Sequence, residues 1–245
     1  MEMGNLVVTG VEPLSRDAII LQTHAPWLGG AKPGQFGMLG GIPGVLLARP
    51  MSIMELRPEG NVAWQVRGVG KGTRTLLDLD LGTELHGWGP LGNSFQLGCT
   101  HPVLVGGGVG MAPLHFLYQE HYRGKGVTLI EGNKDRGGPF LEAWLDVDEA
   151  DRYLSTTEDG SKGMKGLVTV PLEALLEVGQ CDAVFACGPD PMLKAVESLA
   201  LKYGVSCQVA LEARMACGVG GCRGCWDPRH KMMVCCDGPV LEIQV

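Results

Sequence analysis

A glycine-rich loop late in the chain carries the cysteine pattern that most constrains its structure. The segment reads Cys217-Gly-Val-Gly-Gly-Cys222-Arg-Gly-Cys225, so its cysteines have C-x4-C-x2-C spacing. This is the spacing of plant-type [2Fe–2S] sites, in which a fourth, more distant cysteine completes the ligand set. The glycines let the backbone curl closely, so that its N–H groups can face the cluster sulfides. We therefore expect Cys217, Cys222 and Cys225 to ligate a [2Fe–2S] cluster.

Two adjacent cysteines, Cys235 and Cys236, are candidates for the fourth ligand. The residues before them are β-prone, and successive side chains of an extended strand point to opposite faces, so only one thiol can face the cluster. Other interpretations of these cysteines stay open: a structural zinc site, disulfides or incidental thiols. A zinc site usually shows two C-x2-C pairs, or one pair with histidines, whereas only Cys222 and Cys225 form such a pair here.

Length, charge and cysteine content narrow the class of protein. A chain of 245 residues is long enough for two domains and an appendage. Its net charge of −7 argues against a nucleic-acid partner, and we find no apolar run of membrane-spanning length and no secretory leader. Nine cysteines without such a leader indicate metal binding in a reducing compartment, which we expect to be the cytoplasm.

The first part of the chain, residues 1–98, is predicted to form a small antiparallel β-barrel. Short β-prone runs are broken by glycine and proline, with hardly any helical periodicity. The clearest runs are Asn5–Thr9, Ala18–Thr23 and Asn61–Val69. Turn signals stand at Pro33-Gly34, Gly40-Gly41 and Gly92-Asn93.

Two motifs in this region have side chains suited to phosphate and ring contacts. In Arg49-Pro50-Met51-Ser52, the arginine can pair with a pyrophosphate and the serine can hydrogen-bond a ring nitrogen. In Gly70-Lys71-Gly72-Thr73, glycines, a lysine and a hydroxyl suit a phosphate cradle. Taken singly, each has an ordinary alternative: a surface arginine for the first motif and a plain β-turn for the second.

Residues 99–208 are predicted to form an α/β domain. The apolar strand at 101–105 leads into a glycine-rich turn, in which Gly107, Gly108 and Gly110 are the candidate phosphate-binding residues, and then into a helical segment, Met111–Tyr122. Strand, glycine turn and helix form the usual phosphate-binding arrangement, because the backbone can approach closely and the helix N-terminus faces the charge. The strict G-x-G-x-x-G pattern is absent, so a generic βα turn stays open.

Alternating elements continue through this domain and predict a parallel sheet. Further strands are expected at Val127–Ile130, Tyr153–Thr156 and Ala183–Ala186, and helices at Phe140–Leu145, Pro171–Val178 and Pro191–Tyr203. Parallel sheets bind ligands at the carboxyl ends of their strands. The segment Cys187-Gly188-Pro189 directly follows the last of these strands, at such an end. A capped helix start with a buried cysteine is the ordinary alternative.

Together, and in this order, these motifs resemble the ferredoxin-reductase flavoprotein family. The resemblance implies that Arg49 binds the FAD pyrophosphate, that Ser52 lies near the flavin N5, and that Gly70, Gly72 and Thr73 hold the other end of the pyrophosphate. Met51 stands where many members carry a tyrosine stacked on the ring. The resemblance also places Cys187, Gly188 and Pro189 beside the nicotinamide.

The choice of nicotinamide nucleotide is expected to depend on the turn after the third strand. There, NADP-dependent members of the reductase family carry serine and arginine, whereas this chain has Glu158 and Asp159. Two carboxylates repel a 2′-phosphate and can instead accept from a ribose 2′-OH, which favours NAD. Lys162 and Lys165 lie nearby and keep NADP open.

The order of barrel, nucleotide domain and C-terminal [2Fe–2S] module (residues 209–245) resembles the electron-transfer subunit of bacterial NAD-dependent dihydroorotate dehydrogenase, an enzyme of pyrimidine biosynthesis. The family pattern Val-Cys-x-Asp-Gly-Pro implies Cys235 as the fourth ligand. It also implies an FMN-containing catalytic partner, in a heterotetramer with two copies of each subunit, that oxidises dihydroorotate. Electrons would pass through the cluster and FAD to NAD+, and the cofactors would carry the chemistry.

Two other functions are kept in view. One is the small subunit of an NADH-dependent ferredoxin:NADP or sulfide oxidoreductase, which has the same architecture and another partner. The second is a non-enzymatic, metal-stabilised interaction module, against which the flavin motif counts. No side chain is expected to act as general acid or base, and the histidines are expected to pack or to lie on the surface.

Overall fold

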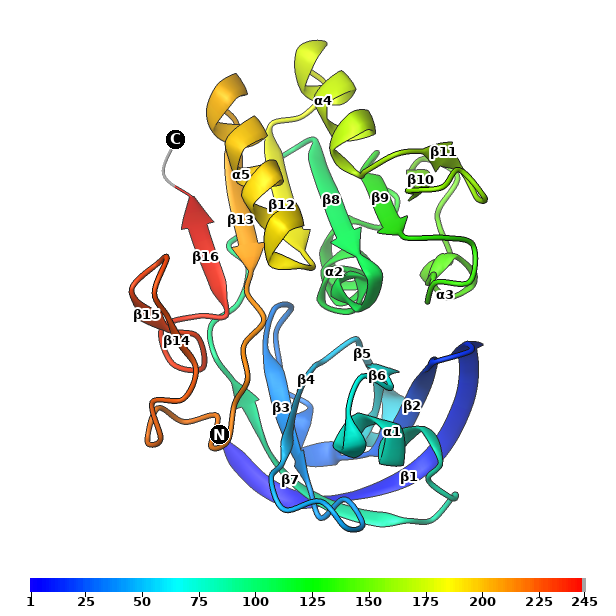
Figure 1. Cartoon of the computed structure of the whole chain (residues 1–245), viewed down its shortest axis with the longest axis vertical. Helices are drawn as coiled ribbons and strands as arrows, with labels where there is room; N and C mark the ends of the chain where they lie inside the picture. The colour runs from blue at the N-terminus through cyan, green and yellow to red at the C-terminus, as the bar shows by residue number, and fades with distance from the viewer. Residues whose placement is uncertain (244–245) are drawn as a thin grey trace. The chain divides into compact units, whose positions relative to one another are not determined.

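The computed structural model describes residues 1–243, which form two compact units (Figure 1). The β unit comprises residues 1–94 and 213–239, and the α/β unit comprises residues 95–212 with the last strand. The cysteine loop is therefore part of the β unit, while the strand that follows it belongs to the α/β unit.

The β unit contains a seven-stranded antiparallel sheet with the strand order β4-β3-β7-β1-β2-β6-β5. Its strands are β1 (Glu2–Ser15), β2 (Ala18–His24), β3 (Phe36–Gly40), β4 (Arg49–Ser52), β5 (Glu55–Arg57), β6 (Asn61–Arg67) and β7 (Glu84–Leu91). Short 3-10 turns lie at Pro26–Leu28 and Pro58–Gly60. The predicted antiparallel β-domain is confirmed, and each of its three predicted strands falls on an observed one.

The two edges of this sheet are joined by Ile53 and Met54. The Ile53 N–H donates to Gln35 O (3.2 Å), just before β3, and the Met54 N–H donates to Ala63 O (3.0 Å) in β6. Both linking side chains are fully buried. The chain thus crosses from one edge strand to the other over an apolar core, which curls the sheet toward a barrel.

One helix, α1 (Lys71–Leu77), interrupts the β unit. It begins directly after Gly70, where a plain β-turn was the ordinary alternative; that alternative is wrong. Leu76 is buried and anchors the helix, and the helix contacts β6. The second predicted phosphate motif therefore forms the first turn of a helix.

The cysteine segment is attached to the β unit by hydrogen bonds on both sides of the loop. Trp88 Nε1 in β7 donates to Cys217 O (2.9 Å), and the Asn93 N–H donates to Gly238 O (2.7 Å). Within the segment, β14 (Trp226–Asp227) pairs with β15 (Met232–Met233) in a small antiparallel ribbon. The long cysteine segment is therefore fixed at its ends and braced in the middle.

The α/β unit contains a second seven-stranded sheet, ordered β11-β10-β9-β8-β12-β13-β16 and parallel except for β16. Its strands are β8 (Pro102–Gly107), β9 (Thr128–Asn133), β10 (Arg152–Thr157), β11 (Met164–Lys165), β12 (Ala183–Cys187), β13 (Ser206–Ala210) and β16 (Val240–Ile243). Its helices are α2 (Met111–Leu117), α3 (Glu142–Leu145), α4 (Thr169–Glu177) and α5 (Asp190–Tyr203). The predicted parallel sheet is confirmed; β13 and β16 were not anticipated.

The strand order reverses beside β8, the first strand of this sheet. β9 and β10 follow on one side of β8, and β12 and β13 follow on the other (Figure 1). Such a reversal leaves a crevice at the carboxyl ends of the two central strands, where nucleotides bind in sheets of this class. The glycine-rich turn begins here, with a 3-10 turn at Gly108–Gly110.

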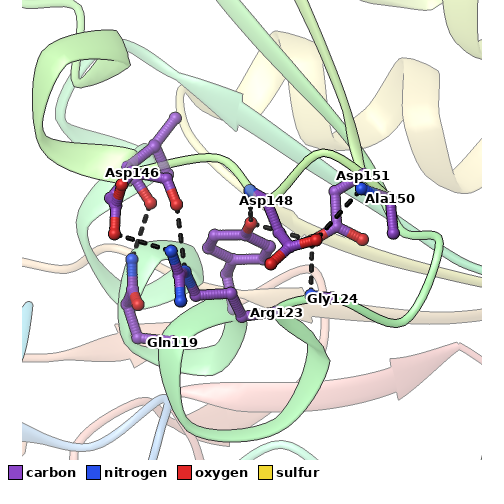
Figure 2. Close-up of polar contacts among 9 residues, drawn as sticks. Gln119, Arg123, Gly124, Asp146, Asp148, Ala150 and Asp151 are labelled. Atoms are coloured by element: carbon purple, nitrogen blue, oxygen red, sulfur yellow. Dashed lines mark hydrogen bonds and ion pairs between the residues drawn. The ribbon is translucent and has the colours of Figure 1, made fainter.

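The predicted helix Met111–Tyr122 ends in a π-helical turn, Tyr118–Tyr122. The Arg123 N–H donates to Tyr118 O (2.9 Å), five residues back, and Tyr118 Oη donates to Asp151 Oδ2 (2.8 Å). Figure 2 shows the Asp151 carboxylate directed at the Gly124 N–H (2.7 Å) and Arg123 directed at Asp146 (2.7 Å). This tertiary network, at the amino end of β9, supports the widened turn.

No helix within residues 1–243 is long and apolar enough to cross a membrane.

Candidate cofactor-binding sites

The structure brings the predicted cluster ligands together in two pairs of thiols. Cys217 and Cys222 approach with their Sγ atoms 3.3 Å apart. Cys225 and Cys235 are both buried, 3% exposed, and their thiols interact with each other. Each iron of an all-cysteine [2Fe–2S] cluster takes two thiolates, so this grouping fits a two-iron cluster.

Backbone N–H groups in the glycine loop point at these sulfurs. The Cys222 N–H donates to Cys217 Sγ (3.4 Å), the Gly220 N–H to Cys235 Sγ (3.2 Å) and the Gly224 N–H to Cys222 Sγ (3.4 Å). Such donors stabilise thiolates and, in iron–sulfur proteins, tune the reduction potential.

The pKa values of the first and the last candidate ligand, Cys217 and Cys235, are shifted in opposite directions. The Val219 and Cys222 N–H groups lower the pKa of Cys217 to about 7. Burial raises the pKa of Cys235 above its ordinary value, so metal binding there must displace a proton. Within residues 1–243, no three His, Cys, Asp or Glu side chains converge as they would around a single metal ion.

The two candidates for the fourth ligand are separated by exposure. Cys235 is buried and accepts from the loop backbone, whereas Cys236 is exposed, with its Sγ 3.6 Å from that of Cys235. The residues before them form β15, and the Cys236 and Asp237 N–H groups both donate to Met233 O. The predicted reason for separating the two thiols, alternation along an extended strand, is wrong: β15 ends at Met233, and both cysteines lie in the tight turn that follows.

The first flavin motif lies on the edge strand β4 and meets the second across the β unit. Arg49 donates through Nη1 to Leu47 O (2.9 Å), and its guanidinium packs against Gly72. A Cβ at Gly72 would lie 2.6 Å from Arg49 Nη2, so a side chain there would displace the guanidinium from this position. The structure therefore joins two segments 23 residues apart into one cationic site that fits a pyrophosphate.

The other residues of these motifs line the same region of the β unit. Thr73 Oγ1 accepts from the Gly70 N–H (3.1 Å) and fixes the start of α1, and Lys71 is exposed at the first position of that helix. In β4, Pro50, Met51 and Ser52 are half-buried, which leaves part of each side chain accessible to a ligand. Thr73 Oγ1 also accepts from the Val69 N–H (3.1 Å) and donates to Gly70 O (3.2 Å), so its hydroxyl shapes the loop.

In the α/β unit, the glycine turn after β8 packs against the segment that follows β12. A Cβ at Gly110 would collide with Cys187 O, and one at Gly107 would lie 2.9 Å from Pro189 Cδ. Gly108 has φ +55°, and a Cβ there would meet only Asn133 Oδ1, at 3.9 Å. Both predicted nicotinamide-domain motifs are thus adjacent at the carboxyl ends of β8 and β12, as a nucleotide crevice requires. Cys187 itself is buried, and desolvation raises its pKa well above the ordinary range.

Asn133, at the end of β9, was not anticipated from the sequence. Its Nδ2 is buried and has no hydrogen-bond partner among residues 1–243, and its Oδ1 lies 3.9 Å from the position of a Cβ on Gly108. A buried amide donor costs free energy unless a partner is supplied. In the sequence, only the position of Asn133 after a predicted strand could have marked it as a candidate ligand-binding residue. Asparagine is common at such positions, so this signal is too weak to identify it.

Glu158 and Asp159 follow β10, two strands away from β8. Asp159 Oδ1 accepts from Ser161 N (2.9 Å) and Oγ (2.6 Å), and Ser161 holds its pKa below the ordinary value. Glu158 is exposed, and its N–H donates to Asn133 O (3.2 Å). Asp159 therefore serves the turn, which leaves Glu158 as the accessible carboxylate at this strand end.

Residues 212–244 match the family described as "Iron-sulfur cluster binding domain of dihydroorotate dehydrogenase B". Over 217 residues, the chain is 38% identical to the dihydroorotate dehydrogenase B (NAD(+)) electron transfer subunit of Caldanaerobacter subterraneus subsp. tengcongensis, covering 85% of this chain and 84% of the relative. The corresponding subunit of Fusobacterium nucleatum is 37% identical over 210 residues, covering 80% and 78%.

Solved structures support the same fold. A chain of an NADH-dependent reduced ferredoxin-NADP oxidoreductase has a TM-score of 0.84 and 28% identity, covering 97% of this chain and 87% of its own. A ferredoxin NADP+ reductase from Neisseria gonorrhoeae, solved with bound FAD and NADP, has a TM-score of 0.64 and 17% identity, covering 83% and 92%. The second likeness concerns the fold alone. With relatives this similar over most of its length, the chain belongs to the family of dihydroorotate dehydrogenase B (NAD(+)) electron transfer subunits.

Proposed function

We propose that this chain passes electrons from a dihydroorotate-oxidising partner to NAD+ through a [2Fe–2S] cluster and FAD. The proposed ligands of the cluster are Cys217, Cys222, Cys225 and Cys235. The observation that carries the proposal is the pairing of these four thiols beneath loop N–H donors. When bound, the cluster and the flavin supply the conversion between one-electron and two-electron transfer. The protein residues bind and orient these groups.

In the β unit, Arg49 binds the FAD pyrophosphate and the first turn of α1 supplies further N–H donors. The packing of Arg49 on Gly72 supports this role, because it aims a guanidinium at the helix start. Ser52 and Met51 contact the flavin ring from the half-buried face of β4. The remaining members of this proposed site are Pro50, Gly70, Lys71 and Thr73.

In the α/β unit, the glycine turn and the segment after β12 bind NAD. Gly107, Gly108 and Gly110 bring backbone close to the pyrophosphate, and Asn133 donates its unpartnered amide. Glu158 accepts from the ribose 2′-OH at the end of β10. The segment Cys187-Gly188-Pro189 borders the nicotinamide, where the buried Cys187 shapes the crevice.

The partner in this proposal is an FMN-containing dihydroorotate dehydrogenase catalytic subunit, with two copies of each subunit in the complex. The printed name of the relatives supports it, since they are electron transfer subunits of that enzyme. We place the complex in the cytoplasm, in keeping with the free thiols of all nine cysteines. In functional terms, we keep the division into a barrel (1–98), a nucleotide domain (99–208) and a cluster module (209–245).

The first experiment is cofactor analysis of the anaerobically purified chain. We expect one FAD and about two irons per chain. Zinc in place of iron would refute the cluster, and extraction of FMN or of no flavin would refute the flavin site.

The second experiment tests the flavin site with Arg49→Ala. A charge-assisted contact of this kind contributes about 1.5–3 kcal/mol, so FAD affinity should fall by roughly ten- to a hundredfold while the cluster spectrum is kept. Arg67→Ala is a matched control, because Arg67 lies in β6 and pairs with Asp17 (2.8 Å). Equal loss of FAD in both variants would refute the assignment of Arg49.

A second candidate function is that of the small subunit of a ferredoxin-NADP oxidoreductase, and the TM-score of 0.84 favours keeping it. The two functions differ in the partner. Purified alone, the chain should oxidise NADH with an artificial acceptor and leave dihydroorotate untouched; with its native partner, it should reduce NAD+ at the expense of dihydroorotate. Activity of the native complex with ferredoxin and NADP, without dihydroorotate turnover, would favour the second candidate.

A further inference from the structure

A charged cluster lies at the carboxyl ends of β9 and β10, beside Glu158. Lys162 Nζ lies 2.7 Å from Glu142 Oε2 and 4.0 Å from the centre of the Phe140 ring. The backbone of Lys162 is bound to Thr157, the last residue of β10, by two hydrogen bonds. The Lys162 N–H donates to Thr157 Oγ1 (3.0 Å), and Thr157 Oγ1 donates to Lys162 O (2.8 Å). The ammonium is therefore held at the turn that carries Glu158, and its charge is compensated there.

The residue that compensates this charge is itself positioned from the core. Glu142 begins α3, and the N–H of the preceding residue, Leu141, donates to both carboxylate oxygens of Glu131 (3.0 and 3.1 Å). Glu131 is fully buried and also accepts from Tyr153 Oη (2.7 Å). A buried anchor thus fixes the start of α3, and with it the side chain that meets Lys162.

We propose that Glu142 is a specificity-determining residue that withholds Lys162 from the 2′-phosphate of NADP. The inference rests on the proposed NAD site at the end of β10. A 2′-phosphate needs a cation nearby. Lys162 and Lys165 are both held at that strand end by Thr157, and the Lys162 ammonium is the one that pairs with Glu142. To serve a phosphate, Lys162 must leave Glu142, which would then stand as a second unpaired carboxylate near Glu158 and repel the phosphate. A ribose 2′-OH makes no such demand.

The test is nucleotide binding by the full-length holoprotein, with 5′-AMP and 2′,5′-ADP as probes in isothermal titration calorimetry. Glu142→Gln should raise the affinity for 2′,5′-ADP about fivefold, the range of a partly exposed ion pair, and leave the affinity for 5′-AMP unchanged. Adding Lys162→Met to Glu142→Gln should abolish the gain. The Glu142 side chain is 53% exposed, so the variant is expected to fold.

Glu149→Gln is the matched control, because it removes one negative charge from an exposed residue between α3 and β10. An equal gain for 2′,5′-ADP in this control would overturn the proposal in favour of overall charge. Persistence of the gain after Lys162→Met would overturn it in favour of another cation, such as Lys165. Wild-type binding of 5′-AMP without any gain in Glu142→Gln would refute the role of Glu142 alone, whereas a wild type that binds neither probe would refute the nucleotide site itself.

Discussion

The two compact units give their cysteines different environments: apolar burial in the α/β unit and backbone N–H donors in the cysteine loop of the β unit. In the α/β unit, Cys181 and Cys207 are buried among apolar side chains, and desolvation raises the pKa of each to about 12. In the cysteine loop of the β unit, N–H donors lower the pKa of Cys217 to about 7. Even Cys235, whose burial raises its pKa, accepts from the Gly220 N–H.

Three loop thiols, those of Cys217, Cys222 and Cys235, accept from backbone N–H groups, which is the environment that a thiolate ligand requires. The thiolate is the form that ligates iron, and it forms readily only where donors or positive charge stabilise it. The α/β unit buries Cys181, Cys187 and Cys207 as small apolar side chains, whereas Cys99 is half-buried with its Sγ 2.9 Å from Tyr122 Oη. The three buried cysteines of the α/β unit and the four candidate ligands of the cysteine loop thus belong to two chemical classes.

The glycines of the two units differ in the same way. In the turn after β8, Gly110 is required by contact, because any Cβ would collide with Cys187 O. In the cysteine loop, Gly218 and Gly220 are required by conformation, with φ of +71° and +79°, while Gly221 has nothing within 4 Å of a Cβ among the described residues. Contact with backbone fixes Gly110 in the turn after β8. The cysteine loop combines positive φ with close packing, since a Cβ at Gly218 would also lie 2.8 Å from Met38 Cγ.

The strongest test of this contrast replaces one cysteine of each class. Cys235→Ser should abolish the visible absorption of the cluster, because the buried fourth thiolate is lost. Cys187→Ser should retain it, since that thiol is buried in the α/β unit. The measurement is the absorption spectrum and iron content of anaerobically purified variants. A full cluster in Cys235→Ser would contradict the assignment.

A second prediction extends the contrast to the buried Glu131 of the α/β unit. Desolvation raises its pKa from 4.5 to about 7, against the opposing effect of the Tyr153 and Leu141 donors. Between these values the folded protein retains a proton that the unfolded chain releases, so stability falls as pH rises from 4.5 to 7. The loss is no more than about 3 kcal/mol.

Glu131→Gln should flatten this dependence, because a glutamine does not ionise. Thermal midpoints of wild type and variant at pH 5.5 and 7.5 provide the measurement, with the exposed Glu149→Gln as control. A variant that loses as much stability between these pH values as the wild type would show that other groups cause the dependence.

The third prediction compares the two glycine loops. Gly110→Ala should destabilise the protein by about 1–3 kcal/mol through overpacking, whereas Gly221→Ala should change its stability by less than about 0.5 kcal/mol. Chemical denaturation of both variants checks the difference. Similar losses would show that the two loops share one packing constraint.

The smallest effect is expected for Cys236→Ser. Its thiol is exposed, and Cys235 is the one that accepts from the loop, so the cluster spectrum should stay unchanged. Cluster loss in this variant, with retention in Cys235→Ser, would reverse the two roles. Loss in neither variant would show that the adjacent thiols replace one another.

Much of the fold could be predicted from hydrophobic periodicity and from the glycine and proline residues that end strands and helices. The three expected strands of the β unit and the alternating elements of the α/β unit lie where the sequence indicated. β13 and β16 were missed because pairing with neighbours in the sheet, rather than a distinctive local pattern, makes them strands. The π-helical turn at Tyr118–Tyr122 was missed because its cause, Asp151, lies outside the helix.

The parallel sheet and the set of cysteines that could bind a cluster could be predicted from the sequence alone, because periodicity and spacing are local properties of the chain. The family was indicated by the resemblance of its motifs and their order. Only the tertiary structure decided how those thiols pair, that Arg49 packs on Gly72, and that Glu142 holds Lys162. The Arg49–Gly72 and Glu142–Lys162 contacts join different elements of the fold, and the thiol pairs depend on how the cysteine loop curls. Their existence depends on strand order and burial, which no single segment encodes.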